Sequence, residues 1–269
     1  MTTHADPTAT TTSTTPAKAS PWRDVPIFAL VTLIASGGLI ALQEFAGSVL
    51  GAGTDGPAQW VQFAPAIGVL AIGLRRVHAG NTRVRDYFAN APGLLVRSFT
   101  AGLTSAAVAL GWAGLMHATG MTDSFAVPLE LSAGGLVAAS AWIVVGSFGE
   151  EVGWRGWLQP LLQDRTGWWT GAVVTGLIWG VWHVQAVTSG FGYAAAFLAS
   201  TIGLSLLMAA FAARLRTGYV WVAGVVHAAF DLALLTRGNG SGADVGQEAL
   251  LGGIVLAAGI ASAAIARRR

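Results

Sequence analysis

The sequence of 269 residues contains no cysteine and few charged residues. The absence of cysteine excludes disulfide bonds, thiolate nucleophiles and metal sites built on cysteine. Charged residues make up only 10% of the chain, against about 25% in soluble domains, whereas hydrophobic residues make up 54%. A surface with so little charge must face something other than water. The composition therefore predicts an integral membrane protein.

Long apolar runs recur along the chain and are typical of membrane-spanning helices. A crossing needs about 20 residues, and a chain rich in Ala, Leu and Gly satisfies its backbone in lipid as helices. We therefore expect an all-α, polytopic membrane protein with about eight transmembrane helices, forming one domain over residues 22–269. Residues 1–21, rich in Thr, Ala and Pro, predict a disordered cytoplasmic tail. The eight apolar runs are 26–50, 58–74, 96–118, 132–163, 169–186, 194–213, 218–236 and 249–266.

The positions of lysine and arginine predict the orientation of these helices. With the N-terminus in the cytoplasm, all of the fifteen basic residues except Arg237 fall on the inner side. Because basic loops stay on the cytoplasmic side, we expect both termini inside, in the cytoplasmic membrane of a prokaryote. The net charge of +2 does not indicate a nucleic-acid partner, since the basic residues mark membrane ends and do not gather on one soluble face.

Polar groups that a membrane interior rarely accepts gather in three of these runs. Glu150 and Glu151 lie deep in the fourth run, His183 in the fifth, and His227 with Asp231 in the seventh. Counted from the inner helix ends they reach a similar depth, so we expect them to meet in one chamber in the cytoplasmic half of the bilayer. A charge at the centre of a span costs about 2.5–3.5 kcal/mol even on permissive insertion scales, which makes a functional site the default interpretation.

Spacing within the runs supports this chamber. His227 and Asp231 are four residues apart, as are Glu151 and Arg155, so each pair shares one face of a helix. In the second pair the acid precedes the base, which is the better order for an ion pair. We expect Arg155 to serve as a structural partner of Glu151.

The fourth run also carries packing signals. As a helix, its 32 residues would extend about 48 Å, so it must tilt, kink or project from the bilayer. Trp179, one turn before His183, is expected to wall the site, and both Trp154 and Trp179 are expected to serve in packing or in the pocket wall and not in the chemistry. Two pairs of small residues predict a close approach of the fourth and fifth helices beside it. These pairs are Gly149/Gly153 and Gly176/Gly180.

Two carboxylates beside two imidazoles suggest the hydrolysis of a carbonyl-type bond. Glu150 suits a general base that activates water. The histidines have two alternative roles. His183 and His227 could bind a metal such as zinc, with an open position for water, or they could position the water and stabilise an oxyanion directly. The chain has no HExxH motif, so both a zinc-dependent and a metal-free reaction stay open.

Three motifs, in order, resemble the signature of the CPBP family, the CAAX proteases and bacteriocin-processing enzymes also called Abi proteins. "EEVGWRG" matches EExxxR, "WGVWH" resembles FxxxH and "HAAFD" resembles HxxxN, over roughly residues 130–235. The resemblance implies an eight-helix membrane fold, endopeptidase activity within the bilayer, and a peptide or protein substrate that is lipidated for some relatives. Both metalloprotease and metal-free, glutamate-dependent mechanisms are attributed to this family.

Carried over by position, the resemblance implies a role for each polar group. Glu150 would be the water-activating base, with Glu151 and Arg155 as its supporting pair. His183 would help to orient the water. His227, together with the residue four positions after it, would form the oxyanion or metal site.

Two positions depart from the family pattern. Trp179 replaces the usual Phe, which is a tolerable aromatic exchange. Asp231 replaces the commoner Asn, and an ionised Asp only accepts hydrogen bonds, whereas Asn also donates them. Asp231 must therefore be protonated, orient His227 or bind a metal.

Two other functions use the same kinds of group. Buried acids and histidines also serve ion pathways, so a proton-coupled transporter is one alternative. A non-catalytic immunity or scaffold protein that kept the fold is the other. No convincing repeat relates residues 26–118 to residues 132–266, which argues against the transporter, and the complete set of acids and histidines argues against the scaffold.

Overall fold

The computed structural model describes residues 21–50, 59–77, 88–123, 131–213, 215, 217–235 and 244–268. Within these ranges the chain is almost entirely helical and contains no strand, so the all-α prediction is confirmed for them. The predicted tail lies, apart from residue 21, outside the described residues. Its disorder stays a prediction.

Each predicted apolar run overlaps one or more of the described helices. Short 3-10 turns, η1 (Pro21–Asp24) and η2 (Trp60–Phe63), precede the first two helices, and a π turn, η3 (Trp154–Leu158), lies between α5 and α6. The α-helices are α1 (Val25–Leu50), α2 (Ala64–Val77), α4 (Leu94–Ala118), α5 (Ala133–Gly153), α6 (Gln159–Thr166), α7 (Trp168–Trp182), α8 (Val184–Thr188), α9 (Phe191–Ala212), α10 (Tyr219–Leu235) and α11 (Val245–Arg268).

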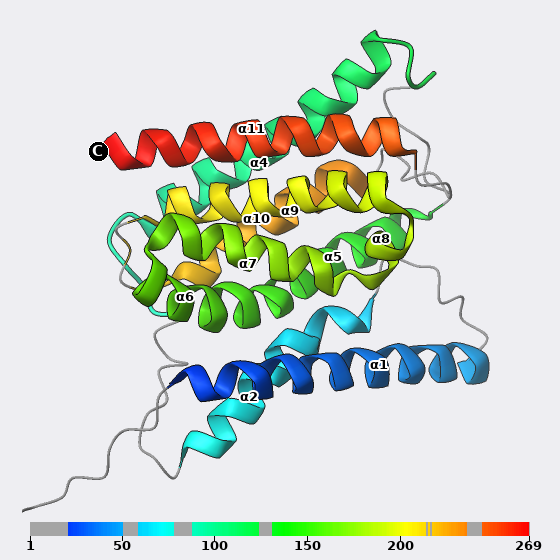
Figure 1. Ribbon diagram of the computed structural model, residues 1–269. Helices are drawn as coiled ribbons and strands as arrows, with labels where there is room; N and C mark the ends of the chain where they lie inside the picture. Colours follow the sequence, from blue (N-terminus) through cyan, green and yellow to red (C-terminus); the bar gives the residue numbers. More distant parts are fainter. Residues whose placement is uncertain are drawn as a thin grey trace, which may run out of the picture.

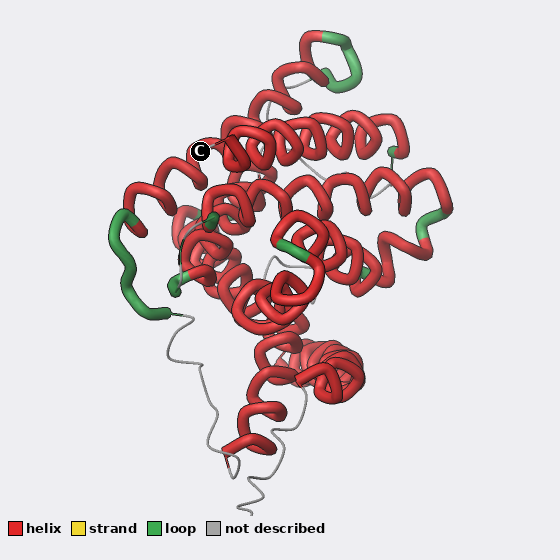
Figure 2. The backbone as a smooth tube through the Cα atoms, turned by 60° about the vertical axis from the view of Figure 1, so that its left-hand side comes forward, coloured by secondary structure: helices red, strands yellow, loops and turns green. Residues whose placement is uncertain are grey.

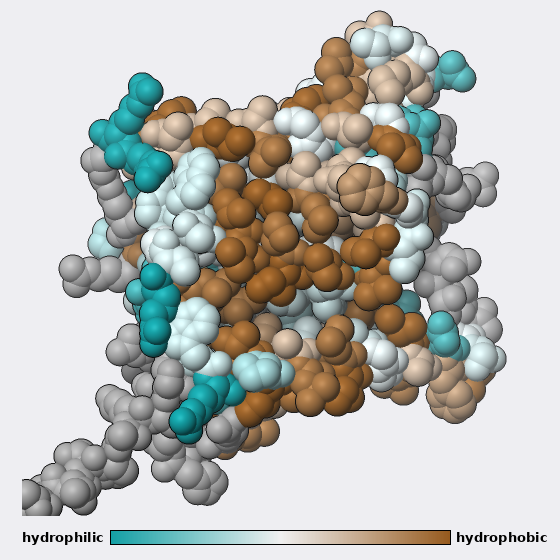
Figure 3. Space-filling view, in the orientation of Figure 1, coloured by the Kyte–Doolittle hydropathy of each residue, from teal (hydrophilic) through white to brown (hydrophobic). Residues whose placement is uncertain are grey.

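Five of these helical segments are long and apolar enough to cross a membrane. Two further apolar helices, Trp60–Leu74 and Tyr219–Leu235, are shorter. Brown apolar side chains cover the middle of the helices, and hydrophilic ones gather toward their ends (Figure 3). The described part of the chain therefore has the helices of an integral membrane protein. Eight crossings and the orientation of the termini stay predictions. The five long segments are Trp22–Val49, Leu94–Ala118, Ala133–Thr166, Phe191–Ala212 and Val245–Arg268.

The helices form a main bundle with a separate pair beside it (Figures 1 and 2). In the bundle, α9 packs between α11 and α7, and α10 packs against α4 and α5. Helix α1 packs mainly on α2 and η2, which in turn contact α5. Helices α1 and α4 begin, and α6 and α11 end, at the same end of the bundle (Figure 1). Most described arginines lie near these helix ends. This end is here named the arginine end and is defined by Arg23, Arg97, Arg165, Arg267 and Arg268.

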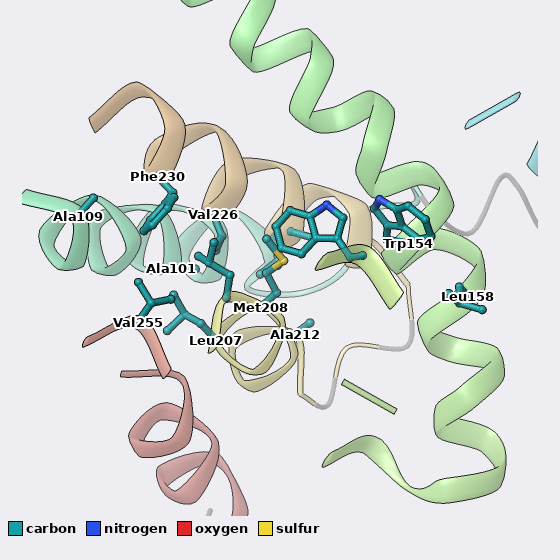
Figure 4. Close-up of a cluster of buried hydrophobic side chains, with 14 of the residues drawn as sticks. Ala101, Ala109, Trp154, Leu158, Leu207, Met208, Ala212, Val226, Phe230 and Val255 are labelled. Carbon is teal, nitrogen blue, oxygen red and sulfur yellow. The ribbon is translucent and has the colours of Figure 1, made fainter. Parts of the chain in front are cut away.

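The interior of the bundle is apolar and joins helices that are distant in sequence. Val226 and Phe230 of α10 meet Leu207 and Met208 of α9, and Val255 of α11 completes this cluster (Figure 4). Lipid is as apolar as these side chains, so burial alone does not hold the helices together. Close van der Waals packing does.

Glycines let α9 and α11 touch backbone to backbone. A Cβ atom on Gly252 would overlap the carbonyl oxygen of Ala196, and one on Gly259 would overlap that of Gly203. Only residues without a side chain permit this approach. The contact brings the first turns of α11 beside the first half of α9, and both segments contribute to the cavity described below.

The glycine pairs predicted to join the fourth and fifth helices face other partners. A Cβ atom on Gly153 would overlap Pro65 of α2, and one on Gly180 would lie 2.5 Å from Thr201 Oγ1 of α9. The predicted close approach of α5 and α7 was therefore wrong, although the glycines do mark tight contacts. The other two members, Gly149 and Gly176, face η2 and α9 in the same way.

The long fourth segment runs without interruption from Ala133 to Thr166. Its irregularity is the π turn Trp154–Leu158, which begins three residues after Glu151. A π turn inserts one extra residue into the helix and is frequent at functional sites. This π turn lies directly beside the two glutamates, whereas the predicted tilt, kink or projection of the segment stays a prediction.

Candidate active site

Glu150 is a buried carboxylate on α5, with only 2% of its surface exposed. Its Oε2 accepts a hydrogen bond of 2.7 Å from the indole Nε1 of Trp179, which lies on α7. This bond fixes the direction of the carboxylate across two helices. Trp179 therefore does more than wall the site, the role expected from the sequence.

Glu151 and Arg155 form an ion pair that is almost completely buried. Arg155 Nη1 donates to both carboxylate oxygens of Glu151, at 2.9 and 3.0 Å, and the guanidinium lies 4.4 Å from the ring centroid of Trp179. Neither residue lines the cavity. The pair lies behind Glu150, and its guanidinium supports Trp179, which holds the Glu150 carboxylate.

His227 lies between two carboxylates. Its Nδ1 is 2.9 Å from Glu151 Oε1, and its Nε2 is 3.4 Å from Asp231 Oδ2. The shorter contact fixes the ring, whereas the longer one leaves Nε2 weakly held. Asp231 is partly exposed and faces the cavity, so it orients His227 from the open side.

His183 lies at a break between α7 and α8. The predicted run 169–186 is therefore not one continuous helix, because His183 adopts φ −76° and ψ 73° and stops the helix. The break deprives the carbonyl oxygen of Trp179 of its helical partner, and His183 Nδ1 lies 2.9 Å from that oxygen. A carbonyl only accepts hydrogen bonds, so Nδ1 carries the proton. In the neutral imidazole, Nε2 is then the nitrogen that can accept a hydrogen bond.

A cavity of about 780 Å³ connects these groups. Glu150, Trp179, His183, His227 and Asp231, which come from three helices, all line it. Of the five polar residues predicted to meet in one chamber, Glu150, His183, His227 and Asp231 line this cavity, whereas Glu151 does not. Trp154 does not reach the cavity. It is buried between the rings of Phe28 and Trp182 instead.

The cavity lies toward the end of the bundle opposite the arginine end. Its lining residues on α9 and α10 lie mostly in the halves of those helices nearest that opposite end, and α11 contributes only its first turns. Residues from η2 and α8 complete its wall. The predicted location in the cytoplasmic half depends on the orientation of the helices and stays a prediction. Beyond those named above, the wall includes Gln59, Gln62, Tyr193, Phe197, Asp244, Gln247 and Glu248.

Several polar lining residues were not anticipated from the sequence. Gln62 interrupts an apolar run, which is a signal that could have identified it. Glu248 lies one residue before the predicted eighth run, and nothing in the sequence distinguishes it from an acidic residue in a solvent-exposed loop. Ser36 of α1 accepts a 3.0 Å hydrogen bond from Trp182 Nε1 and so ties α1 to the end of α7. This last contact joins segments far apart in sequence.

The described residues do not fit a zinc site in this arrangement. Among them, no three His, Asp or Glu side chains are placed to hold a metal ion together. Both ring nitrogens of His227 face carboxylate oxygens, and of the two histidines only His183 has an uncommitted nitrogen. Catalytic zinc needs three protein ligands and an open position.

Comparison with known families agrees with the motifs. Residues 132–233 match the family described as type II CAAX prenyl endopeptidase Rce1-like. This segment contains all three motifs and every predicted site residue, from Glu150 to Asp231. None of the curated proteins compared with the chain matches it. The resemblance inferred from the motifs is thus confirmed: over residues 132–233 this chain is similar to the CAAX proteases of the CPBP family.

Proposed function

We propose that this protein is an intramembrane endopeptidase of the CAAX-protease type that hydrolyses a peptide bond with a water activated by Glu150. The family implies a peptidase with a peptide or protein substrate. The observation that carries the mechanism is the buried Glu150 carboxylate, held by Trp179, on the wall of the cavity that His183 also lines.

Glu150 and His183 act on the water together. Glu150 takes one proton from the water, and His183 Nε2 accepts a hydrogen bond from the other O–H, which directs the oxygen toward the carbonyl carbon of the substrate. General-base assistance of this kind contributes about 100-fold to 10,000-fold to a rate. The tetrahedral intermediate then collapses, and Glu150 passes its proton to the leaving amine.

His227 is the candidate donor to the oxyanion. Glu151 fixes the imidazole ring through Nδ1. The contact of Nε2 with Asp231 is long, so the Nε2–H can donate to a stronger acceptor. A preorganised donor of this kind is worth about 100-fold to 1,000-fold in kcat. In this assignment, Asp231 orients His227. A carboxylate, which accepts hydrogen bonds, can fill that role as well as the amide of the commoner Asn does.

The membrane arrangement belongs to the same proposal. We propose eight crossings with both termini in the cytoplasm, so that the arginine end faces inward. The cavity then lies toward the outer side. No finding favours the transporter or the scaffold alternative.

Cleavage of peptides by the purified protein in proteoliposomes tests this function. We expect Glu150→Gln to lower kcat about 100-fold or more while the protein keeps its thermal unfolding temperature, because Gln has the same shape but accepts no proton. The matched control is Glu44→Gln, an exposed acid of α1 that does not line the cavity. Undiminished cleavage by Glu150→Gln would reject the assignment.

Two further arms of this assay test the finer points. Chelator is expected to leave cleavage unchanged, and a chelator-induced loss restored by zinc would overturn the metal-free mechanism. The substrates are pairs of peptides that differ only in a prenyl group. The family description names prenyl endopeptidases, and this comparison shows whether the present protein requires that group.

A further inference from the structure

The charges that line the cavity have one sign apart from the two histidines. Four carboxylates line it, and no described lysine or arginine does. Two of these carboxylates, Glu150 and Asp231, belong to the proposed machinery. The other two, Asp244 and Glu248, come from the start of α11 and have no role in the reaction described above.

Glu248 is built into the wall of this cavity. Its Oε1 accepts a hydrogen bond of 3.2 Å from Ser200 Oγ of α9, and its side chain is only partly exposed. Asp244, by contrast, uses its Oδ1 to cap the backbone N–H of Gln247 and is exposed. Of the two acids, Glu248 is the one held in a fixed position and drawn away from bulk solvent.

A single turn of α9 connects Glu248 to the proposed reaction centre. The ring of Phe197 lies 5.1 Å from that of His183. Ser200, which holds Glu248, is three residues further along, so both side chains lie on the same face of α9. Glu248 and the histidine that would direct the water therefore contact residues about one helical turn apart on α9.

We propose that this cavity selects a substrate segment carrying a lysine or arginine side chain close to the cleaved bond, and that Glu248 is the specificity-determining residue that pairs with it. The inference rests on the proposed peptidase function. In a partly enclosed cavity, a carboxylate without a cation is costly, and an arriving cation is favoured.

The position of the acids in the bundle agrees with this selection. Glu248, Asp244 and Asp231 lie toward the end opposite the arginine end, where α11 begins and α10 ends. A cationic segment that approaches from this end meets carboxylates first. From the other end it would meet the described arginines, which repel it.

Cleavage of matched peptides by the full-length protein tests the proposal. The peptides are acetylated and amidated, share one sequence, and carry Lys, Gln or Glu at one position near the bond. We expect KM for the Lys peptide to be about tenfold lower than for the Gln peptide, and KM for the Glu peptide to be the highest of the three.

Glu248→Gln identifies the residue responsible. Gln still accepts the hydrogen bond from Ser200 but carries no charge, so the fold should persist. We expect KM for the Lys peptide to rise about tenfold with kcat unchanged, and the difference between Lys and Gln peptides to disappear. Glu44→Gln removes the same charge from an exposed site outside the cavity and should keep the wild-type preference.

Binding to Glu150→Gln separates this inference from the proposed function. Fluorescence anisotropy on that variant measures peptide affinity without any cleavage. Tighter binding of the Lys peptide, lost when Glu248→Gln is added, would support the inference even if no peptide is cleaved. Equal affinity for the Lys, Gln and Glu peptides would overturn it, whether or not the enzyme is active.

Discussion

At the scale of single residues, every charge beside Glu150 has a partner of opposite sign or an aromatic face. Arg155 meets Glu151 and the ring of Trp179, and Glu151 also meets His227. Two other nitrogens of Arg155, Nε and Nη2, have no hydrogen-bond partner among the described residues. The ion pair is therefore held by one nitrogen and by the indole, and it depends closely on its surroundings.

Removal of Arg155 should destabilise the protein more than removal of a surface arginine. We expect Arg155→Ala to lower the free energy of unfolding by about 3–5 kcal/mol, because it leaves the charge of Glu151 buried without its partner. Cleavage should fall as well, since Glu151 fixes His227. Thermal unfolding in detergent measures the first effect. Arg268→Ala, exposed near the end of α11, is the control and should change little.

At the scale of helices, the site depends on two irregular segments and on close helix contacts. The break at His183 points one imidazole into the cavity, and the π turn follows the glutamates. The contact of α9 with α11 then brings Glu248 to Ser200. This contact relies on Gly252, whose face is covered by α9, whereas a Cβ atom on the adjacent Gly253 would meet nothing within 4 Å.

These adjacent glycines offer a matched test of helix packing. Gly252→Ala should destabilise the protein by about 1–3 kcal/mol, because the new methyl group overlaps the carbonyl of Ala196 and forces the helices apart. Gly253→Ala should be neutral or slightly stabilising, since Ala is the better helix former. Unfolding temperatures of the two variants in the same detergent decide the matter. Equal effects would contradict the close approach of α9 and α11.

At the scale of the whole molecule, the cavity forms where the main bundle meets the α1–α2 pair. Residues of α1, η2, α8, α9, α10 and α11 all contribute to its wall. Helix α1 contributes Ser36, whose hydrogen bond with Trp182 links the pair to the bundle. The cavity and the arginine end therefore lie toward opposite ends of the same molecule, and the orientation of the protein decides which compartment the cavity faces.

The absence of native cysteine makes this orientation directly measurable. A single cysteine at Asp123, beyond the end of α4, should react with a membrane-impermeant maleimide added to intact cells. One at Thr166, at the end of α6, should react only after the cells are opened. The cysteine-free parent is the blank. Reversed labelling would mean that the arginine end, and not the cavity, faces outward.

Much of the fold class and of the site was predictable because the relevant patterns are local. Apolar runs located the long helices that the structure describes, since a span is defined by its own composition. The spacing of His227 and Asp231 placed both on one face of α10, and Glu150 and His183 were identifiable as polar groups inside apolar runs. These properties depend on residues close together in the chain.

Only the tertiary structure decided the partners of these residues and the extent of the cavity. Nothing near His183 in the sequence marks the helix break, because no proline or glycine lies beside it. Gly153 and Gly180 signalled close contacts but not which helices they touch. Glu248 reaches the cavity wall only because α11 packs against α9. Contacts between distant segments depend on the shapes of both partners, and a local pattern describes only one of them.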